Sequence, residues 1–218
     1  MWSYYGSKSK IVQYYPIPKH DLIIEPFAGS ARYALRYSDK EVILNDLDEN
    51  IVKVWEYLIK VKSDEIFNLP ELVKGDKLDM FNLTDSQRRL MSFMVGYSTT
   101  GKRNTYTGRA ARDNEIRRCK NRILANLDKI RHWNIKNTHY ETLPDVEASW
   151  YVDPPYQNGG KYYKHNKVDY LRLAEWCKSR KGQVIVCENN FASWLPFRPL
   201  KVMQGGIRKS LEMIWTND

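Results

Sequence analysis

The sequence predicts an α/β protein with a mostly parallel sheet and a helical insertion, on the strength of three observations. Short apolar runs alternate with amphipathic helical stretches near the start of the chain, which is typical of a parallel sheet. The alternation stops near residue 62, a helical stretch extends to about residue 130, and strand-like runs then resume. One of these later runs ends in Asp153-Pro154-Pro155-Tyr156, and open α/β sheets bind their ligands at such strand ends.

The first half of the predicted sheet follows from the hydrophobic pattern of the first sixty residues. Residues 21–24 are predicted to form a buried strand, which turns at residues 25–30 into a helix over residues 31–37. A second strand over residues 41–44 leads through Asn45-Asp46 to a helix over residues 49–60, where apolar side chains recur at helical spacing. Strand, helix, strand and helix in this order indicate parallel pairing.

The helical stretch is predicted from its caps and its periodicity. Thr84 and Gln87 have the spacing of a capping box, and a helix is expected to follow as far as Met94. Residues 98–112 are polar and lack periodicity, which predicts a loop. Asp113 is expected to cap the next helix, whose apolar face carries Ile116, Cys119, Ile123, Leu127 and Ile130.

The second half of the sheet is predicted from five further apolar runs. They cover residues 134–140, 149–152, 183–187, 199–203 and 211–216. The last two are expected to be joined through Gly205-Gly206.

Charge and composition narrow the class of partner. The chain has 218 residues, of which 42% are hydrophobic, enough for one sizeable core. Thirty-five Lys and Arg against 26 Asp and Glu give a formal net charge of +9, which indicates a polyanionic partner without defining a reaction. Aromatic residues make up 13% of the chain; most are expected in the core, and some could stack on bases.

Other functional classes are disfavoured by what the sequence lacks. The three cysteines are widely spaced, so disulfides are not expected. This cysteine usage predicts a reducing, cytoplasmic location. The four histidines form no metal-binding pair, and no metal site is expected. No apolar run is long enough to span a membrane, and no signal-peptide core is present at the N-terminus.

Two features of the first half suggest a nucleoside ligand. Gly29 lies in the turn after the first strand, where a ligand can approach the backbone at the start of a helix, although a tight turn alone would also need a glycine. Asp46 follows the second strand, the place of an acid that accepts hydrogen bonds from ribose hydroxyls. Asp46 could instead cap the next helix, a role that Asp48 fits equally well.

The Asp153–Tyr156 turn suits recognition of an exocyclic amino group on a flat heterocycle. Two successive prolines stiffen the exit of the strand. The Asp153 carboxylate and the Pro154 carbonyl could then accept the two N–H bonds of the amino group, while the Tyr156 ring stacks on the base. Read alone, the turn leaves adenine, cytosine, glutamine or a merely rigid surface loop open.

Taken together, these motifs resemble those of the Dam-like DNA adenine-N6 methyltransferases, over nearly the whole chain. Tyr4-Tyr5-Gly6-Ser7-Lys8 matches the family's aromatic-x-Gly-x-Lys, and Glu25 to Gly29 matches its Glu-Pro-Phe-x-Gly turn. Asp46 matches the ribose acid and Asp153 to Tyr156 the catalytic Asp-Pro-Pro-Tyr, in the family's order. Ala31 departs from it, since many members have a second glycine there, but the small alanine is expected to be tolerated.

The resemblance implies a fold and a domain organisation. The fold would be the Rossmann-like sheet of class I methyltransferases, with seven mostly parallel strands and an antiparallel last strand. Residues 1–62 and 131–218 would form the catalytic, cofactor-binding domain, and residues 63–130 a helical target-recognition insertion.

The resemblance also implies S-adenosyl-L-methionine as the cofactor. Lys8 and Tyr4 would lie near its methionine end, Phe27 and Gly29 beside its backbone, and Tyr140 with His139 near its adenine. The residues predicted to bind the cofactor are Tyr4, Tyr5, Gly6, Ser7, Lys8, Glu25, Pro26, Phe27, Ala28, Gly29, Ser30, Asp46, Leu47, His139, Tyr140 and Asp153.

The implied reaction is methyl transfer to N6 of an adenine flipped out of duplex DNA. Asp153, Pro154, Pro155 and Tyr156 would be the catalytic residues. Positioning and electrostatics would supply most of the acceleration, without a covalent enzyme intermediate. In agreement, none of the three cysteines follows a proline, as the nucleophile of cytosine-C5 enzymes does.

The DNA contacts are predicted from basic, polar segments. Arg103-Asn104 resembles the family's Arg-x-Asn-x-x-Gly segment without its intervening residue; Arg and Asn read base edges, although a solvated loop would have a similar composition. Residues 157–164 are expected to form a mobile segment that holds the flipped strand. The predicted nucleic-acid-binding residues are Lys102, Arg103, Asn104, Arg109, Arg112, Arg117, Lys161, Tyr162 and Lys164.

Several alternatives stay open at this point. Methylation of adenine in RNA would use the same pocket, and a catalytically silent DNA-binding relative would keep the fold. Cytosine-N4 enzymes more often begin the turn with Ser, and protein-glutamine enzymes with Asn, so Asp153 favours adenine. A monomer or weak dimer is expected. The sequence does not define the recognition site. It also does not show whether the protein belongs to a restriction-modification system, a phage or the host.

Overall fold

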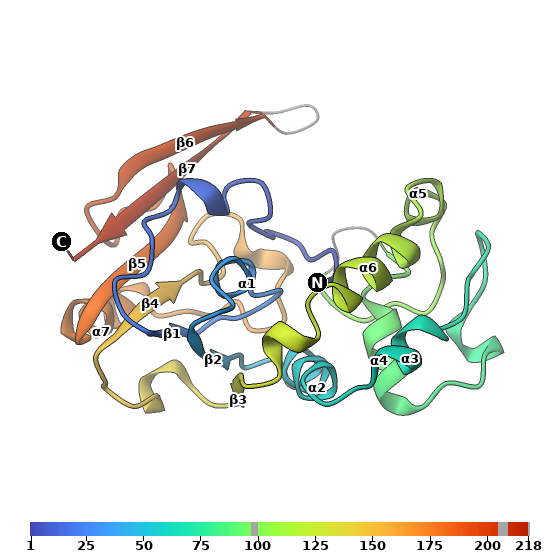
Figure 1. The fold of residues 1–218 in the computed structure, drawn as a ribbon. Coiled ribbons are helices and arrows are strands. Elements are labelled where there is room, and N and C mark those ends of the chain that lie inside the picture. The colour runs from blue at the N-terminus through green and yellow to red at the C-terminus, as the bar shows by residue number, and fades with distance from the viewer. Residues whose placement is uncertain (97–99, 205–208, 218) are drawn as a thin grey trace.

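A single sheet organises the chain, as Figure 1 shows. The computed structural model describes residues 1–96, 100–204 and 209–217. Within them, seven strands pair in the order β3-β2-β1-β4-β5-β7-β6. The strands are β1 (Leu22–Glu25), β2 (Glu41–Asn45), β3 (Asn134–Lys136), β4 (Ala148–Val152), β5 (Gly182–Asn189), β6 (Arg198–Gln204) and β7 (Lys209–Thr216).

Most of the pairing is parallel. β1 lies between β2 and β4, with Ile24 opposite Ile43 on one side and Trp150 on the other. β7 is inserted between β5 and β6 and runs antiparallel to both. The predicted α/β fold, with seven mostly parallel strands and an antiparallel last strand, is therefore confirmed. The strand order reverses between β1 and β4, which is where sheets of this kind bind ligands.

The helices occupy two regions. α1 (Arg32–Arg36), α2 (Glu49–Leu58) and α7 (Tyr170–Ser179) connect strands of the sheet. Four more helices in the described part of the chain are grouped on the right of Figure 1 beyond α2: α3 (Ser63–Phe67), α4 (Asp85–Ser92), α5 (Gly108–Arg112) and α6 (Glu115–Leu124). The described residues also form short 3₁₀ helices, which are η1 (Val12–Tyr14), η2 (Leu78–Met80), η3 (Asp128–Ile130), η4 (Tyr140–Thr142) and η5 (Gly160–Tyr162).

The helical region packs onto the sheet through a shared core. Trp2 and Trp55 lie with their ring centroids 5.1 Å apart, and Phe93, just after α4, lies 6.0 Å from Trp2. All three are fully buried in a cluster that also contains Ile23 of β1 and Ile116 of α6. Because this core is continuous, the division into a catalytic domain and a target-recognition insertion stays a prediction.

Several sequence predictions need correction. The predicted loop at residues 98–112 contains α5, which begins where the Thr107 side chain accepts a hydrogen bond from Ala110 N. Asp113 ends α5 and does not cap the next helix; α6 begins after Asn114, which has φ of 48°. The strand predicted over residues 134–140 ends at Lys136, because the chain turns there towards η4.

One helix was not predicted from the sequence, and one helix cap was predicted correctly. The pattern of residues 170–179 was not predicted as a helix, although Asp169 caps α7 by accepting from Arg172 N. The capping box of Thr84 and Gln87 is confirmed. The predicted Gly205-Gly206 connection lies outside the described residues. Throughout the described ranges, no helix combines the length and apolarity needed to cross a membrane.

Candidate active site

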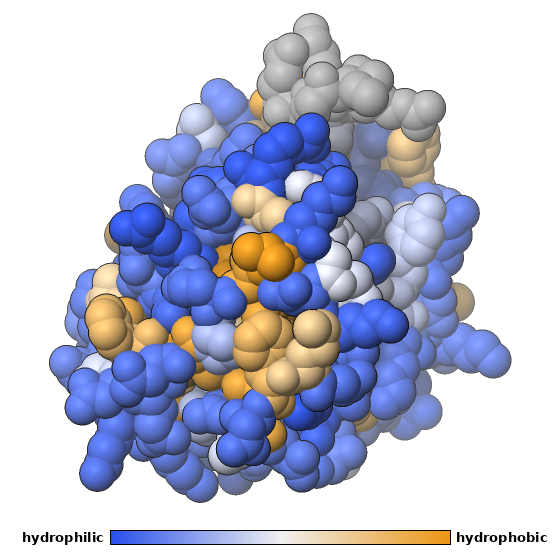
Figure 2. All heavy atoms as spheres, turned by 90° about the vertical axis from the view of Figure 1, so that its right-hand side faces the viewer, coloured by the Kyte–Doolittle hydropathy of each residue, from blue (hydrophilic) through white to orange (hydrophobic). Residues whose placement is uncertain are grey.

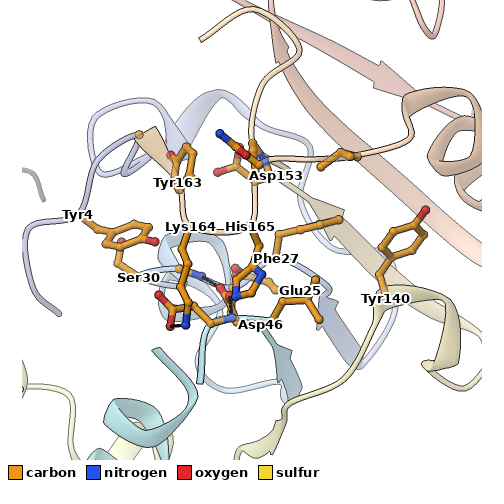
Figure 3. A pocket seen from close by; sticks show the side chains of 18 of the residues that line it. Tyr4, Glu25, Phe27, Ser30, Asp46, Tyr140, Asp153, Tyr163, Lys164 and His165 are labelled. Atoms are coloured by element: carbon orange, nitrogen blue, oxygen red, sulfur yellow. Dashed lines mark hydrogen bonds and ion pairs between the residues drawn. The ribbon is translucent and has the colours of Figure 1, made fainter. Parts of the chain in front are cut away.

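A cavity of about 500 Å³ opens at the carboxyl ends of β1, β2 and β4. Its walls come from residues 4–8, the turn after β1, residues 46–48 after β2, Asp153 and Pro155 after β4, and a segment within residues 163–172. Figure 3 shows Tyr4 and Tyr140 on opposite sides of the view, with Asp153, Phe27 and Asp46 between them. The cavity therefore lies at the strand ends where the sequence predicts ligand binding.

The structure brings together nearly all the residues predicted to bind the cofactor. Every one of them except Pro26 lines this cavity. Pro26 is buried, and its carbonyl accepts a hydrogen bond from Asn45 Nδ2 at 3.0 Å. Of the four residues predicted to be catalytic, Asp153 and Pro155 line the cavity, whereas Pro154 and Tyr156 do not.

The turn after β1 is held in a conformation that favours glycine. Gly29 has φ of +46°, and a Cβ atom there would lie 3.2 Å from the Tyr4 ring. Gly29 N donates to Asp46 Oδ2 at 3.0 Å, and its carbonyl accepts from Trp55 Nε1 at 2.9 Å. The glycine thus lets Tyr4 pack closely against the turn while hydrogen bonds on both sides fix it.

Ala31 has the same left-handed geometry, with φ of 45° at the start of α1. This conformation costs an alanine roughly 1–2 kcal/mol, a cost that glycine would avoid. Ala31 N donates to Ala28 O at 2.7 Å, so the turn keeps its hydrogen bond in spite of the substitution.

Asp46 and Asp48 have separate roles. Asp46 accepts from Gly29 N through Oδ2 and from Asp48 N through Oδ1, at 3.0 and 2.9 Å. Asp48 caps α2 by accepting from Asn50 N at 3.0 Å. Burial raises the pKa of Asp46 to about 6 despite these backbone donors. Each Asp46 oxygen has a second acceptor direction, so a ribose hydroxyl could still bind there.

Glu25 fixes the start of α1 relative to β1. It is fully buried, its Oε1 atom accepts from Ala34 N at 2.7 Å, and burial raises its pKa well above the ordinary value. Because the same residue lines the cavity, it adds an acidic group to a wall that also contains Asp46 and Asp48.

Aromatic rings form the side of the cavity near Tyr140. The ring centroids of Phe27 and His139 lie 5.6 and 4.4 Å from that of Tyr140, and Trp176 of α7 packs edge-on behind it at 5.1 Å. The predicted neighbours of the cofactor adenine are therefore assembled around one ring cluster.

Asp153 is paired with Lys8. Lys8 Nζ lies 2.9 Å from Asp153 Oδ1 and also donates to Gly6 O at 3.3 Å. Burial raises the pKa of Asp153 to about 6, and the nearby Lys8 ammonium only partly opposes this. Burial disfavours the charge of Lys8, but Asp153 and Glu212 outweigh it, so the pKa of Lys8 is raised.

The exit from β4 is stiffened by groups that the sequence did not reveal. Tyr170 OH donates to Pro155 O at 2.8 Å, and Gln157 N donates to Glu188 Oε1 at 2.7 Å. Gly160 packs directly on Pro155, since a Cβ atom there would lie 2.9 Å from its side chain. The two prolines are therefore only part of what holds Asp153 in place.

Tyr156 is restrained by its neighbours. Its hydroxyl donates to Glu212 Oε1 at 2.5 Å, and Lys8 Nζ lies 4.5 Å from its ring centroid. The ring is half-buried and does not line the cavity. Stacking of Tyr156 on a flipped base stays a prediction.

The segment that follows the catalytic turn lies against the N-terminal residues. Tyr163 OH donates to Tyr5 O at 3.0 Å, and the Tyr163 ring packs near those of Tyr4 and Tyr5. Gly6 has φ of +72°, and a Cβ atom there would lie 2.4 Å from Tyr163 OH. The predicted mobility of residues 157–164 is not tested, but their end forms part of the cavity wall.

Lys164 belongs to this wall as well. Its side chain is exposed and its Nζ atom lies 3.8 Å from Asp48 Oδ1 at the cavity wall (Figure 3). Its predicted contact with nucleic acid stays a prediction. Further lining residues that the sequence did not single out are Arg32, His165, Asn166, Lys167, Val168, Asp169 and Arg172. A helix prediction over 170–179 would have drawn attention to the last of these.

The remaining residues predicted to bind nucleic acid are exposed. Asn104 donates from Nδ2 to Asp79 Oδ2 at 2.6 Å, which orients its amide, and Arg109 and Arg112 border a shallow depression with Lys74. The face that Figure 2 shows, on the right of Figure 1, is largely hydrophilic with a limited apolar area near its centre. The other exposed residues that were predicted to bind nucleic acid are Lys102, Arg103, Arg117, Lys161 and Tyr162. DNA contact at any of them stays a prediction.

Among the described residues, no group of three or more His, Cys, Asp or Glu side chains is placed to hold a metal ion.

The sheet order, with a ligand cavity at the carboxyl ends of β1, β2 and β4, defines the fold of class I methyltransferases. Residues 4–86 match the D12 class N6 adenine-specific DNA methyltransferase family, which confirms the resemblance found in the sequence and identifies the chain as a methyltransferase. This match includes Lys8, Gly29 and Asp46 and ends before Asp153.

A comparison with solved structures finds matches at low sequence identity. An Escherichia coli protein, yhhF, proposed to be a methyltransferase, is 11% identical with a TM-score of 0.39; the similarity covers 88% of this chain and 73% of that one. A conserved hypothetical protein of Streptococcus pyogenes is 10% identical, with a TM-score of 0.36 and coverages of 88% and 84%. The rRNA methyltransferase aviRa from Streptomyces viridochromogenes is 14% identical, with a TM-score of 0.39 and coverages of 91% and 79%. A search of curated proteins found no match.

Proposed function

We propose that this methyltransferase transfers a methyl group from S-adenosyl-L-methionine to N6 of an adenine flipped out of DNA. One observation carries the proposal: the carboxylate of Asp153, paired with Lys8 at 2.9 Å, faces the same cavity as the Gly29 turn and Asp46. The amine-recognising turn and the nucleoside-binding half, which are more than 100 residues apart in sequence, thus share one site.

The cavity suits the proposed cofactor. Three buried or half-buried acids, Glu25, Asp46 and Asp48, line it and favour a cationic ligand with hydroxyl donors. Lys8 offers a counter-ion for a carboxylate, and the Phe27–Tyr140 ring pair offers an apolar surface for a base. When bound, S-adenosyl-L-methionine would supply an electrophilic methyl group on a sulfonium.

The residues of the turn would activate the acceptor. The lone pair of adenine N6 is delocalised into the ring, so the amine is a poor nucleophile until its hydrogens are held out of the ring plane. Lys8 contacts Asp153 Oδ1, and we assign the amine to Oδ2 and to the Pro154 carbonyl. The carboxylate also stabilises the positive charge that develops on N6.

Asp153 must be ionised to accept these hydrogens. Because burial raises its pKa to about 6, activity should fall as the pH drops through that value. No general base with a pKa above 7 is needed, since the protonated product amine is a strong acid that loses its proton readily.

Exposed cations on the helical region support a nucleic-acid substrate, and the match of residues 4–86 to a family of DNA methyltransferases supports DNA over RNA. Arg112 and Arg117 lie on α5 and α6, and the chain carries a net charge of +9. Target recognition by residues 63–130, a cytoplasmic location and a monomeric or weakly dimeric state remain expectations alongside this proposal.

The test is methyl transfer with labelled cofactor to duplex DNA and to RNA of the same sequence. Wild-type protein should yield N6-methyladenine in DNA, and Asp153→Ala should abolish it while the exposed Asp39→Ala control keeps it. Label on RNA alone, label on cytosine, or equal transfer by the Asp153→Ala variant would overturn the proposal.

A further inference from the structure

Glu212 lies next to the catalytic turn but outside the cavity. It belongs to β7, where its backbone is opposite Asn189 of β5 and Lys201 of β6. Its side chain is only 14% exposed. An acid this well covered needs partners to be stable.

The partners of Glu212 are all groups around the candidate site. Tyr15 OH and Tyr156 OH each donate to Glu212 Oε1 at 2.5 Å. Lys8 Nζ lies 3.7 Å from the same oxygen. One carboxylate oxygen therefore connects the N-terminal segment, the catalytic turn and the lysine that pairs with Asp153.

This arrangement gives Lys8 two counter-ions. The ammonium is 2.9 Å from Asp153 and 3.7 Å from Glu212, and it lies over the Tyr156 ring. With all three groups ionised, the cluster has a net charge of −1. When a substrate amine engages Asp153, Lys8 keeps an anion beside it and need not hold Asp153 alone.

Glu212 also fixes the direction of Tyr156. The hydroxyl is bonded to Glu212 at one end, while the Lys8 ammonium covers one ring face at 4.5 Å. The two contacts restrain the ring next to Asp153. Glu212 can thus contribute to the geometry of the site without touching the substrate itself.

We propose that Glu212 is a positioning residue for methyl transfer: it holds Tyr156 and serves as the second counter-ion of Lys8, which releases Asp153 to the substrate amine. The inference rests on the proposed function, because it assigns Asp153 to the acceptor amine.

The charge of Glu212 also acts on Asp153 directly. Burial and the carboxylates of Glu212 and Glu188 raise the pKa of Asp153, whereas Lys8 lowers it. Several groups in the described part of the chain interact electrostatically with Asp153. They are Lys8 from the N-terminal segment, Glu25 from β1, Tyr151 from β4, Tyr156 and Tyr163 from the segment after β4, Cys187 and Glu188 from β5, and Glu212 from β7. Neutralising Glu212 should therefore move the titration of Asp153 to lower pH.

Two variants separate charge from contact. Glu212→Gln keeps an acceptor oxygen for the tyrosines and removes the charge, whereas Glu212→Ala removes both. The Ala variant should lower kcat about 100-fold, the factor expected when a positioning group shifts by about 1 Å, with the KM for S-adenosyl-L-methionine changed by less than about threefold. The Gln variant should retain more activity and shift the acid limb of its pH profile to lower pH. Glu175→Gln, exposed on α7, is the matched control and should leave both unchanged.

The outcomes are distinguishable. The inference would be overturned if Glu212→Gln and Glu212→Ala both match wild type in kcat and pH profile. It would also be overturned if Glu212→Ala loses activity only because the variant unfolds, while Glu212→Gln has the kcat and pH profile of the wild type. If the wild type methylates no DNA, the proposed function fails, and a ¹³C-NMR titration of the Asp153 carboxyl in cofactor-free protein still decides the role of Glu212. There, an Asp153 titration midpoint that is the same in wild type and Glu212→Gln would refute it.

Discussion

Replacing Asp153 with Asn should abolish methyl transfer and yet stabilise the folded protein. Burial raises the pKa of Asp153 from its ordinary 3.8 to about 6, so the ionised carboxylate is less favourable in the folded than in the unfolded chain. At about 1.36 kcal/mol for each tenfold change in proton affinity, this amounts to roughly 3 kcal/mol. The neutral amide of Asn avoids that cost and nearly preserves the side-chain volume.

The sign of the effect fixes its pH dependence. A carboxyl group with a raised folded-state pKa contributes its full stability below its unfolded pKa, and this is lost as the pH rises through the folded value. The gain from Asp153→Asn should therefore be small near pH 4 and approach roughly 3 kcal/mol at pH 8.

Urea unfolding followed by tryptophan fluorescence between pH 4 and 8 measures this difference. The exposed Asp39→Asn variant serves as the control. A variant Asp153→Asn that is less stable than wild type at pH 8 would refute the reasoning, because the pair with Lys8 would then outweigh the cost of burial.

Three further predictions concern the cofactor turn and the DNA surface. Asp46→Asn keeps one oxygen that can accept from either Gly29 N or Asp48 N, but it places an amide donor opposite the other N–H group. It should therefore weaken S-adenosyl-L-methionine binding at least about tenfold and destabilise the protein by about 1–3 kcal/mol; calorimetry and thermal melts that match wild type would contradict this. Gly29→Ala should cost about 1–2 kcal/mol in unfolding free energy because φ is +46° and the new Cβ meets the Tyr4 ring, and an unchanged Tm would argue against the strain. Arg117→Ala should remove a phosphate contact, so it should weaken binding to all DNA sequences alike and reduce the slope of log affinity against log salt by about 0.9. Fluorescence anisotropy measures both effects, and a loss of affinity confined to one sequence would instead indicate that Arg117 contacts a base.

The parts of the fold that were predictable have strong local signals. β1, β2 and β4 are short apolar runs with buried side chains, and α2 shows five apolar positions at helical spacing. The missed or misplaced elements have weaker signals. α5 has only five residues and two arginines, so its pattern is that of a polar loop. At the start of α6, Asn114 and not Asp113 precedes the helix, in a left-handed backbone that Asn adopts more readily than most residues but that the hydrophobic pattern does not indicate.

Site residues that directly follow a strand could be predicted from the sequence. Site residues whose position depends on how the strands pair in the sheet could not. Asp46 and Asp153 come directly after strands, so their meeting at one edge follows from parallel pairing. Glu212 lies within β7, and an isolated acid in a strand usually faces solvent. Only the pairing of β7 between β5 and β6 turns it towards Tyr156, and that insertion of the last strand leaves no mark in the local sequence.

The hydrogen bond between Tyr15 and Glu212 joins residues that are 197 positions apart in the chain. Bringing such distant groups together costs loop-closure entropy and slows folding compared with local contacts. Since Tyr156 reaches the same oxygen, the early, middle and late parts of the polypeptide must all be present before this junction can form. During synthesis, the cofactor-facing half can acquire its strands first, but Lys8 and Tyr156 gain their shared anchor only when β7 has been inserted into the sheet. Insertion of β7 into the sheet and acquisition of methyl-transfer geometry are thereby tied to the same folding event.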